Sequence, residues 1–125
     1  MKAQVDNPVA KPTKRYDLED RTLQFSKEVI RFVNNLPKTV ANVEIGKQLV
    51  RSAGSVGANY IEANEALGRK DFVMRVRIAR KEAKETRYWL ELAEYSEGQA
   101  QIQKELVQES TELLKILSAI ITKSQ

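Results

Sequence analysis

Cysteine and histidine are both absent from this 125-residue chain. Without cysteine, the chain can form no disulfide, no thiolate metal site and no cysteine nucleophile. Without histidine, it lacks the commonest general base, the usual partner of a catalytic serine and the commonest zinc ligand. Any enzyme built from this sequence would have to use Asp, Glu, Lys, Arg, Ser or Tyr alone. The composition therefore favours a non-enzymatic protein that carries no cofactor.

Helix-breaking residues and long apolar runs are also scarce. The chain has five glycines, three prolines and 6% aromatic residues, which favours long helices over a turn-rich sheet. No segment approaches the roughly 20 consecutive apolar residues of a membrane span. The first 15 residues have no apolar run of the kind that marks a secretory signal. We expect a cytoplasmic protein with no membrane partner.

Four segments have the spacing of amphipathic helices, because their apolar or small residues recur in alternating steps of four and three. Asp17 and Asn42 are the predicted N-caps of the first two, and Pro37 and Gly68 the predicted stops. The third segment is expected to end before Gly98. The four predicted core stripes are Leu18, Thr22, Phe25, Val29, Phe32 and Leu36; Ile45, Leu49, Ser52, Val56, Asn59, Ala63 and Ala66; Phe72, Val76, Ala79, Ala83, Thr86, Leu90 and Ala93; and Ile102, Leu106, Ser110, Leu113, Leu117 and Ile120.

Four such stripes joined by short connections predict an all-α protein, an antiparallel up-down-up-down four-helix bundle. The bundle is expected over residues 16–125, and residues 1–15 are expected to be a flexible basic tail. Further apolar residues lie beside the stripes, among them Ile30, Val33, Ile78, Trp89, Leu92, Ile116 and Ile121. They either widen the core of one chain or form a surface that another copy buries, and we favour a homo-oligomer.

The second predicted helix places polar and very small residues in its apolar pattern, including Ser52, Asn59 and two glycines at 54 and 57. Each glycine inside a helix costs about 1 kcal/mol relative to alanine, so a close approach of another helix is expected to compensate. A buried Asn59 would fix the packing register. The alternative is that Arg51, Asn59 and Glu62 line a recognition site. We favour the structural interpretation.

Carboxylates recur three residues apart, as Glu62 with Glu65 and Glu82 with Glu85. Such pairs on two antiparallel helices can converge on a divalent cation, as in metal-dependent nucleotide hydrolases. The simpler interpretation is that Glu82 and Glu85 form ion pairs with neighbouring cations such as Arg51, Lys81 and Arg87. We predict no metal site and keep the hydrolase as the less favoured alternative.

Charge is concentrated in the third predicted helix. Residues 69–87 carry eight Arg or Lys against three acidic residues, whereas residues 88–125 carry three against six. A basic helical face needs nothing more to contact phosphates without sequence preference. We predict weak binding to RNA or DNA through Arg77, Arg80, Lys81, Lys84 and Arg87. The alternative is an ordinary solvated face on a scaffold that binds only proteins. Trp89 is expected to be a packing anchor.

Two motifs connect the chain with a known family. Residues 48–63, QLVRSAGSVGANYIEA, closely resemble the Q-x-x-R-S-x-x-S-x-x-A-N-x-x-E-[AG] signature of bacterial four-helix-bundle proteins first noted as reading frames within intervening sequences of 23S ribosomal RNA genes. Residues 78–92, IARKEAKETRYWLEL, resemble the third-helix signature of the same family. The residues that match these signatures are Arg51, Ser52, Ser55, Asn59, Glu62, Glu82, Glu85 and Trp89. The resemblance extends over about residues 16–122, and so does not include the tail.

The resemblance implies a ring-shaped homo-oligomer, a pentamer with a central channel. It also implies kinship with the accessory proteins of diversity-generating retroelements, which are pentamers that associate with a reverse transcriptase and turn a basic surface towards nucleic acid. No catalytic residues come with the family.

Overall fold

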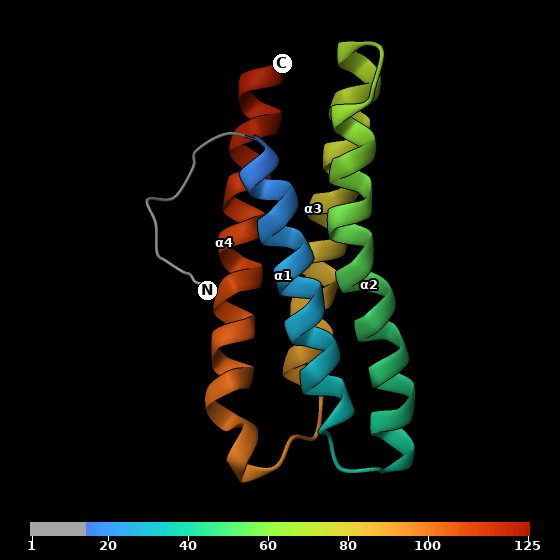
Figure 1. The fold of residues 1–125 in the computed structure, drawn as a ribbon, viewed down its shortest axis with the longest axis vertical. Coiled ribbons are helices and arrows are strands. Elements are labelled where there is room, and N and C mark those ends of the chain that lie inside the picture. The colour runs from blue at the N-terminus through green and yellow to red at the C-terminus, as the bar shows by residue number, and fades with distance from the viewer. Residues whose placement is uncertain (1–14) are drawn as a thin grey trace, which may run out of the picture.

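The computed structural model describes residues 15–125, so the expected basic tail lies outside the described residues except for its last position. The chain forms helices α1 (Arg15–Asn34), α2 (Val40–Asn64), α3 (Arg69–Leu92) and α4 (Ala100–Ser124), with one 3-10 turn, η1 (Glu97–Gln99), before α4. The helices run alternately up and down side by side (Figure 1). The prediction of an all-α four-helix bundle is confirmed for the part of the chain that is described. No helix in that part is long and apolar enough to cross a membrane.

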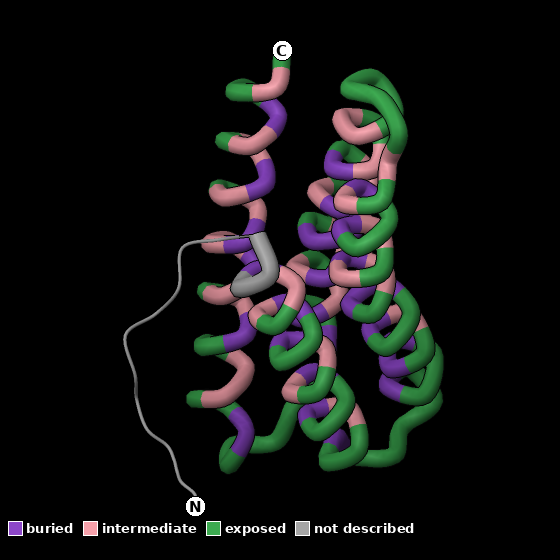
Figure 2. The backbone as a smooth tube through the Cα atoms, turned by 45° about the horizontal axis from the view of Figure 1, so that its top comes forward, coloured by how far each residue is buried: buried purple, intermediate pink, exposed green. Residues whose placement is uncertain are grey.

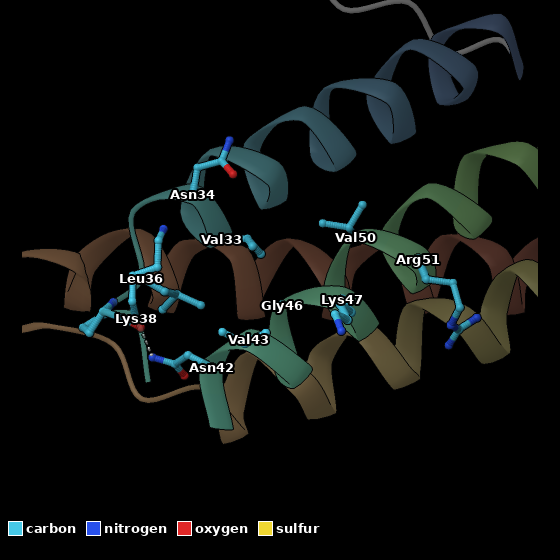
Figure 3. A pocket seen from close by; sticks show the side chains of 11 residues that line it. Val33, Asn34, Leu36, Lys38, Asn42, Val43, Gly46, Lys47, Val50 and Arg51 are labelled. Atoms are coloured by element: carbon cyan, nitrogen blue, oxygen red, sulfur yellow. Dashed lines mark hydrogen bonds between the residues drawn. The ribbon is translucent and has the colours of Figure 1, made fainter. Parts of the chain in front are cut away.

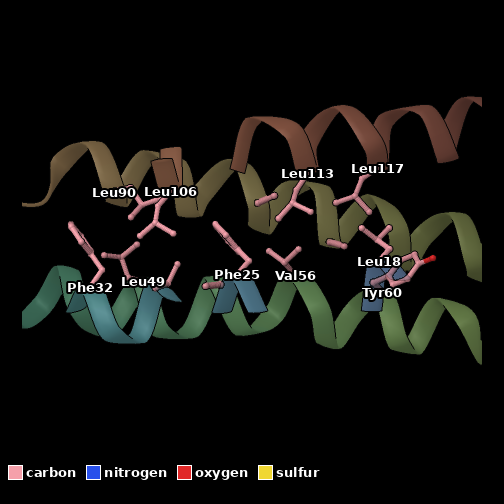
Figure 4. Packing of buried hydrophobic residues seen from close by; sticks show 14 of the residues in the cluster. Leu18, Phe25, Phe32, Leu49, Val56, Tyr60, Leu90, Leu106, Leu113 and Leu117 are labelled. Atoms are coloured by element: carbon pink, nitrogen blue, oxygen red, sulfur yellow. The ribbon is translucent and has the colours of Figure 1, made fainter. Parts of the chain in front are cut away.

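The core runs along the centre of the bundle, where the buried faces of the four helices meet (Figure 2). Its largest fully buried side chains include Phe25, Leu49, Leu90, Leu106 and Leu113, which come from all four helices and pack together (Figure 4). Each such side chain contributes about 1.5–3 kcal/mol when it is fully buried. Each helix contributes one buried row, because residues about 3.5 positions apart lie on the same side of a helix.

The predicted stripes match most of this core, but five of their residues are only half-buried: Asn59, Ala66, Phe72, Ile102 and Ile120. All six residues of the α1 stripe are buried. On α2, however, Tyr60 and Ala53 are buried whereas Asn59 is only half-buried, so the expectation of a buried Asn59 is wrong. On α4, Ile121 is buried in place of Ile120. A straight helix turns about 20° per heptad relative to a 3.5-residue repeat, so towards the end of a long helix the buried position moves one residue on.

Three predicted helix boundaries are wrong. Helix α1 begins at Arg15, so Asp17 lies in its first turn and is not the N-cap. No proline or glycine lies between residues 13 and 17 to stop the helix there. The N-cap of α2 is Thr39, whose side chain accepts a hydrogen bond from the Asn42 amide. Gly68 does not stop α2, which ends at Asn64; it precedes the first residue of α3 instead.

Asn42 does not cap α2. Its side chain instead links the α1–α2 connection to the α3–α4 connection. Its buried amide nitrogen donates to the carbonyls of Pro37 and Glu94, both at 2.9 Å, and its oxygen accepts from the Glu94 amide at 3.0 Å. Gln99 acts similarly, because its amide nitrogen donates to the Phe32 carbonyl at 3.1 Å. The two side chains satisfy backbone groups at helix ends that would otherwise lack partners. They hold the end of α1 against both ends of the α3–α4 connection.

The small residues of α2 allow α1 to approach closely, as predicted. A Cβ added at Gly57 would lie 2.9 Å from Thr22 Oγ1 and 3.3 Å from Thr22 Cβ, which is closer than atoms normally pack. Thr22 is buried, β-branched and bonded through its hydroxyl to the Glu19 carbonyl, so it cannot easily move aside. A Cβ added at Gly54 would lie 3.9 Å from Ser26 Oγ, an ordinary contact. Only the first of these two glycines is required by packing between the helices.

We predict that Gly57→Ala destabilises the fold by about 1–2 kcal/mol, because overpacking against Thr22 outweighs the gain in helix propensity. Gly54→Ala is the matched control and should stabilise the fold by up to about 1 kcal/mol. The shift in urea midpoint at constant slope measures both changes. Equal shifts for the two variants would contradict the close-approach explanation.

Candidate functional site

Four of the residues shared with the family signatures meet at the middle of the α2–α3 pair: Arg51, Glu82, Glu85 and Trp89. Arg51 on α2 donates to Glu82 Oε1 at 3.2 Å and to Glu85 Oε2, both on α3. The indole nitrogen of Trp89, one turn further along α3, donates to the same oxygen of Glu85 at 3.1 Å. Glu82 is almost fully buried, whereas 47% of the Arg51 side chain is exposed. One guanidinium therefore joins two carboxylates across the helix pair, with its outer side open to solvent.

Charges within this network stabilise one another. The Trp89 N–H lowers the pKa of Glu85, desolvation opposes this, and Arg51 and Lys81 contribute further lowering. Partial desolvation alone would lower the pKa of Arg51, but the carboxylates of Glu82 and Glu85 outweigh it and raise that pKa above its ordinary value. Both groups are thus held in their charged forms. The chemistry of the network is that of a structural ion pair, with no group held ready to transfer a proton.

Two further contacts join α2 to α3, one next to Arg51 and one about two turns further along α2. The Thr86 hydroxyl donates to Ser52 Oγ at 2.8 Å in the buried core. Arg75 contacts Asn59 Oδ1 at 3.4 Å, and the Asn59 amide nitrogen donates to the Ser55 carbonyl. With Arg51, these contacts fix the register of α2 against α3.

The considered recognition site of Arg51, Asn59 and Glu62 is not assembled as one cluster. Arg51 bonds to Glu82 and Glu85 near the middle of the helix pair, and Asn59 bonds to Arg75 two turns further along α2. Glu62 is exposed nearly one turn beyond Asn59. Arg51, Asn59 and Glu62 therefore lie at three separate positions along α2 and do not form a single site.

The two carboxylate pairs do not converge. Glu82 and Glu85 lie opposite Arg51, whereas Glu62 is eleven residues further along α2, about 16 Å at 1.5 Å per residue. Glu65 follows the end of α2. Within residues 15–125, no group of three or more acidic side chains is arranged to hold a metal ion. Glu82 and Glu85 are bound to Arg51, which was the simpler of the two interpretations.

The five predicted nucleic-acid residues all lie on α3, but they differ in orientation. Arg77, Lys81 and Lys84 are exposed. Arg80 and Arg87 are half-buried against α4, where their guanidinium groups lie 3.4 Å from Ser118 Oγ and 3.3 Å from Thr111 Oγ1. The structure therefore separates an outward row of cations from two arginines that lie along the α3–α4 boundary.

Helix α4 extends this basic face, which the sequence analysis did not predict. Lys115 lies midway between Thr111 and Ser118, the two residues of α4 that meet the arginines. Lys84 lies midway between Arg80 and Arg87 on the opposing helix, so the two lysines stand at the same height beside this boundary. Residues 88–125 are acidic in sum, which concealed the contribution of Lys115. Only the pairing of α3 with α4 identifies it.

An apolar groove lies on the other side of the bundle, between the end of α1 and the start of α2 (Figure 3). Its volume is about 590 Å³, and Val33, Leu36, Val43, Gly46 and Val50 are among the residues that line it. Gly46 lies close to α1 in this groove, where a Cβ would be only 2.9 Å from Val33 Cγ1. The groove has cations at its edge and no acidic residue among those that line it; the cations are Lys38, Lys47 and Arg51.

We predict that Glu85→Gln lowers the melting temperature at pH 7 and that the difference from the unchanged protein disappears on acidification. Because folding lowers the pKa of Glu85, its stabilisation is present above the unfolded value near 4.5 and is lost as the pH falls through the folded value. Thermal unfolding between pH 7 and pH 3 measures this. Glu105→Gln on the exposed face of α4 should show no such trend, and a constant deficit for Glu85→Gln across the range would refute the explanation.

Comparison with known proteins places the chain in a family. The family model described as 23S rRNA-intervening sequence protein matches residues 14–119. A crystal structure of a protein of unknown function from the S23 ribosomal protein family of Bacteroides thetaiotaomicron superimposes with a TM-score of 0.71 and 35% identity, and the match covers 83% of this chain and 97% of that one. No curated protein matches. The chain belongs to the family of 23S rRNA-intervening sequence proteins.

Proposed function

We propose that this protein is a non-enzymatic, ring-shaped homo-oligomer that binds RNA or DNA weakly and without sequence specificity. The observation that carries the proposal is the basic face along α3, where Arg77 and Lys84 are exposed and Arg80 and Arg87 lie beside α4. Lys115 adds a further cation from α4, although its ammonium also lies 3.8 Å from Glu112 Oε2. Cations in this arrangement meet successive phosphates of a nucleic-acid backbone and release its bound counterions.

The α3–α4 boundary favours phosphate over a protein carboxylate partner. Arg80 and Arg87 lie beside Ser118 and Thr111, and guanidinium groups are common phosphate donors, whereas the Thr111 hydroxyl itself donates to the Val107 carbonyl. Helix α4 has no exposed large apolar side chain, as is typical of a surface that stays wet.

Assembly strengthens this weak contact. Large apolar side chains are exposed on α1, α2 and α3, more than one bundle needs to leave uncovered. A second copy would cover them, and a closed ring would repeat the basic face once per subunit. Each repeat raises the effective concentration of the next face along a bound strand. The resemblance to pentameric relatives supports five subunits.

We predict that reversing Arg80 and Lys84 together to glutamate abolishes retention of single-stranded RNA and leaves helicity intact. Affinity for a labelled RNA is measured between 50 and 200 mM salt. The unchanged protein should lose affinity steeply as salt rises, by a slope of about −0.7 for each phosphate contact. Circular dichroism of the variant verifies that its helices are kept.

The matched control is Lys27→Glu with Lys38→Glu, which changes the net charge equally but on α1 and the α1–α2 connection. This control should retain RNA. Unchanged retention in the α3 variant, or an equal loss in the control, would refute the basic face. An unchanged protein without any salt-dependent affinity would instead support a scaffold that binds only proteins.

A further inference from the structure

Exposed apolar residues form a stripe on α2 that faces away from α3. The stripe consists of Val40, Val43, Val50 and Ile61. Val43, Val50 and Ile61 alternate along α2 with the glycines at 46, 54 and 57, whose nearest neighbours are on α1. The stripe therefore lies on the side of α2 that borders α1, and Val43 and Val50 also line the apolar groove (Figure 3). It spans 21 residues, about 31 Å.

A second stripe lies on the outer side of α3. It consists of Met74, Tyr88 and Leu92, with Tyr95 just beyond the end of the helix. Arg75 and Glu82, which contact α2, lie roughly a quarter-turn away around α3, and Glu85 lies at the edge of the stripe. The α2 stripe and the α3 stripe thus lie on different faces of the bundle. They are not in contact within one chain.

The two stripes match in height along the bundle. Asn42 bonds to Glu94, Ser52 to Thr86 and Asn59 to Arg75, and moving one residue forward on α2 means moving one residue back on α3. Val50 is two residues before Ser52, and Tyr88 is two residues after Thr86, so they share one level.

The same counting places the other members of the stripes. Val43 stands level with Leu92, within one residue, and Ile61 level with Met74. Val40 and Tyr95 are level at the end of the bundle. Each of the four residues of the α2 stripe therefore lies at about the same height along the bundle as one residue of the α3 stripe.

Charges at intermediate levels are opposite in sign. Lys47 is five residues before Ser52, and Glu91 is five residues after Thr86, so these two share a level. By the same reckoning from the Asn59–Arg75 contact, Glu65 shares a level with Arg69. All four side chains are exposed. The level of Lys81 corresponds to Gly57 and Ala58, which leave room for a long side chain.

We infer that the α2 stripe of one copy packs against the α3 stripe of a second, parallel copy. A copy generated by rotation about an axis parallel to the helices keeps every residue at its own height, so only stripes with matching levels can meet. The contact joins two different surfaces and continues from subunit to subunit, which closes a ring. The inference rests on the proposed assembly and specifies how it is built.

This arrangement gives Lys81 a different role from its neighbours. Lys81 lies between Met74 and Tyr88 on the α3 stripe, with seven residues to each. In the ring, its methylenes pack against α2 of the next subunit, whereas Arg80, Lys84 and Arg87 stay on the side towards α4. Arg77 lies between the two sides, in one hollow with Met74 and Lys81. The assembly surface and the basic face therefore adjoin each other on α3.

Two variants test the inference, each with one broken stripe. The first carries Val43→Glu and Val50→Glu, and the second carries Tyr88→Glu and Leu92→Glu. Each alone should be a folded monomer of 14.2 kDa, because every contact in its ring needs the altered stripe. Mixed in equal amounts, they should form a dimer of about 28 kDa, twice the chain mass, since each mixed pair retains one intact α2 stripe and one intact α3 stripe.

Light scattering and circular dichroism are recorded for each variant and for the mixture. Ala119→Glu on the exposed face of α4 is the control and should assemble as the unchanged protein does. The assignment of the interface is overturned if the unchanged protein assembles and either variant also assembles. It is equally overturned if the unchanged protein assembles and the mixture stays monomeric. In both cases the ring itself stands. A monomeric unchanged protein would overturn the ring itself.

Discussion

The register between α2 and α3 is the constraint on which the rest of the structure depends. Arg51 fixes it at the middle of the helix pair by bonding to both Glu82 and Glu85, and the buried hydroxyl contact of Ser52 with Thr86 fixes it next to that point. A shift of one helical turn would separate the guanidinium from both carboxylates and leave Glu82 buried without its cation, which is costly. With the register set, the heights of all exposed residues on the two helices are set as well. The network thus links a polar motif in the sequence to the shape of the outer surfaces.

The sequence predicted the helices and most of the core because apolar periodicity is read along one helix at a time. It was less successful where the outcome depended on neighbouring helices. Asn42 looked like a cap, but its side chain bonds to Pro37 and Glu94, and a partner 52 positions away cannot be inferred from local spacing. Asn59 looked buried because it continues the apolar spacing, but it lies at the edge of the α2–α3 contact, where it meets Arg75 and is only half-buried. The sequence predicted that another helix approaches the small residues of α2 closely. It could not show that Gly57 makes a tight contact and Gly54 does not.

The candidate site shows the same contrast between features that local spacing predicts and features that depend on neighbouring helices. Sequence spacing indicated that Glu82 and Glu85 would either find cations or meet a metal, and Arg51 decides between these within the described residues. The charge count along the chain located the basic helix but missed Lys115, because local sums average over faces that point in different directions. Helix α3 carries both surfaces at once. One side presents cations towards α4, another presents exposed apolar side chains, and a third contacts α2.

The measurement that tests this account most directly is the mass of the purified, unchanged protein in solution, determined by light scattering together with the ratio of absorbance at 260 and 280 nm. The account predicts a mass near 71 kDa, five times that of the 14.2 kDa chain, with co-purifying nucleic acid that is released by high salt. A chain of 14.2 kDa with no bound nucleic acid would contradict both the assembly and the role given to the basic face.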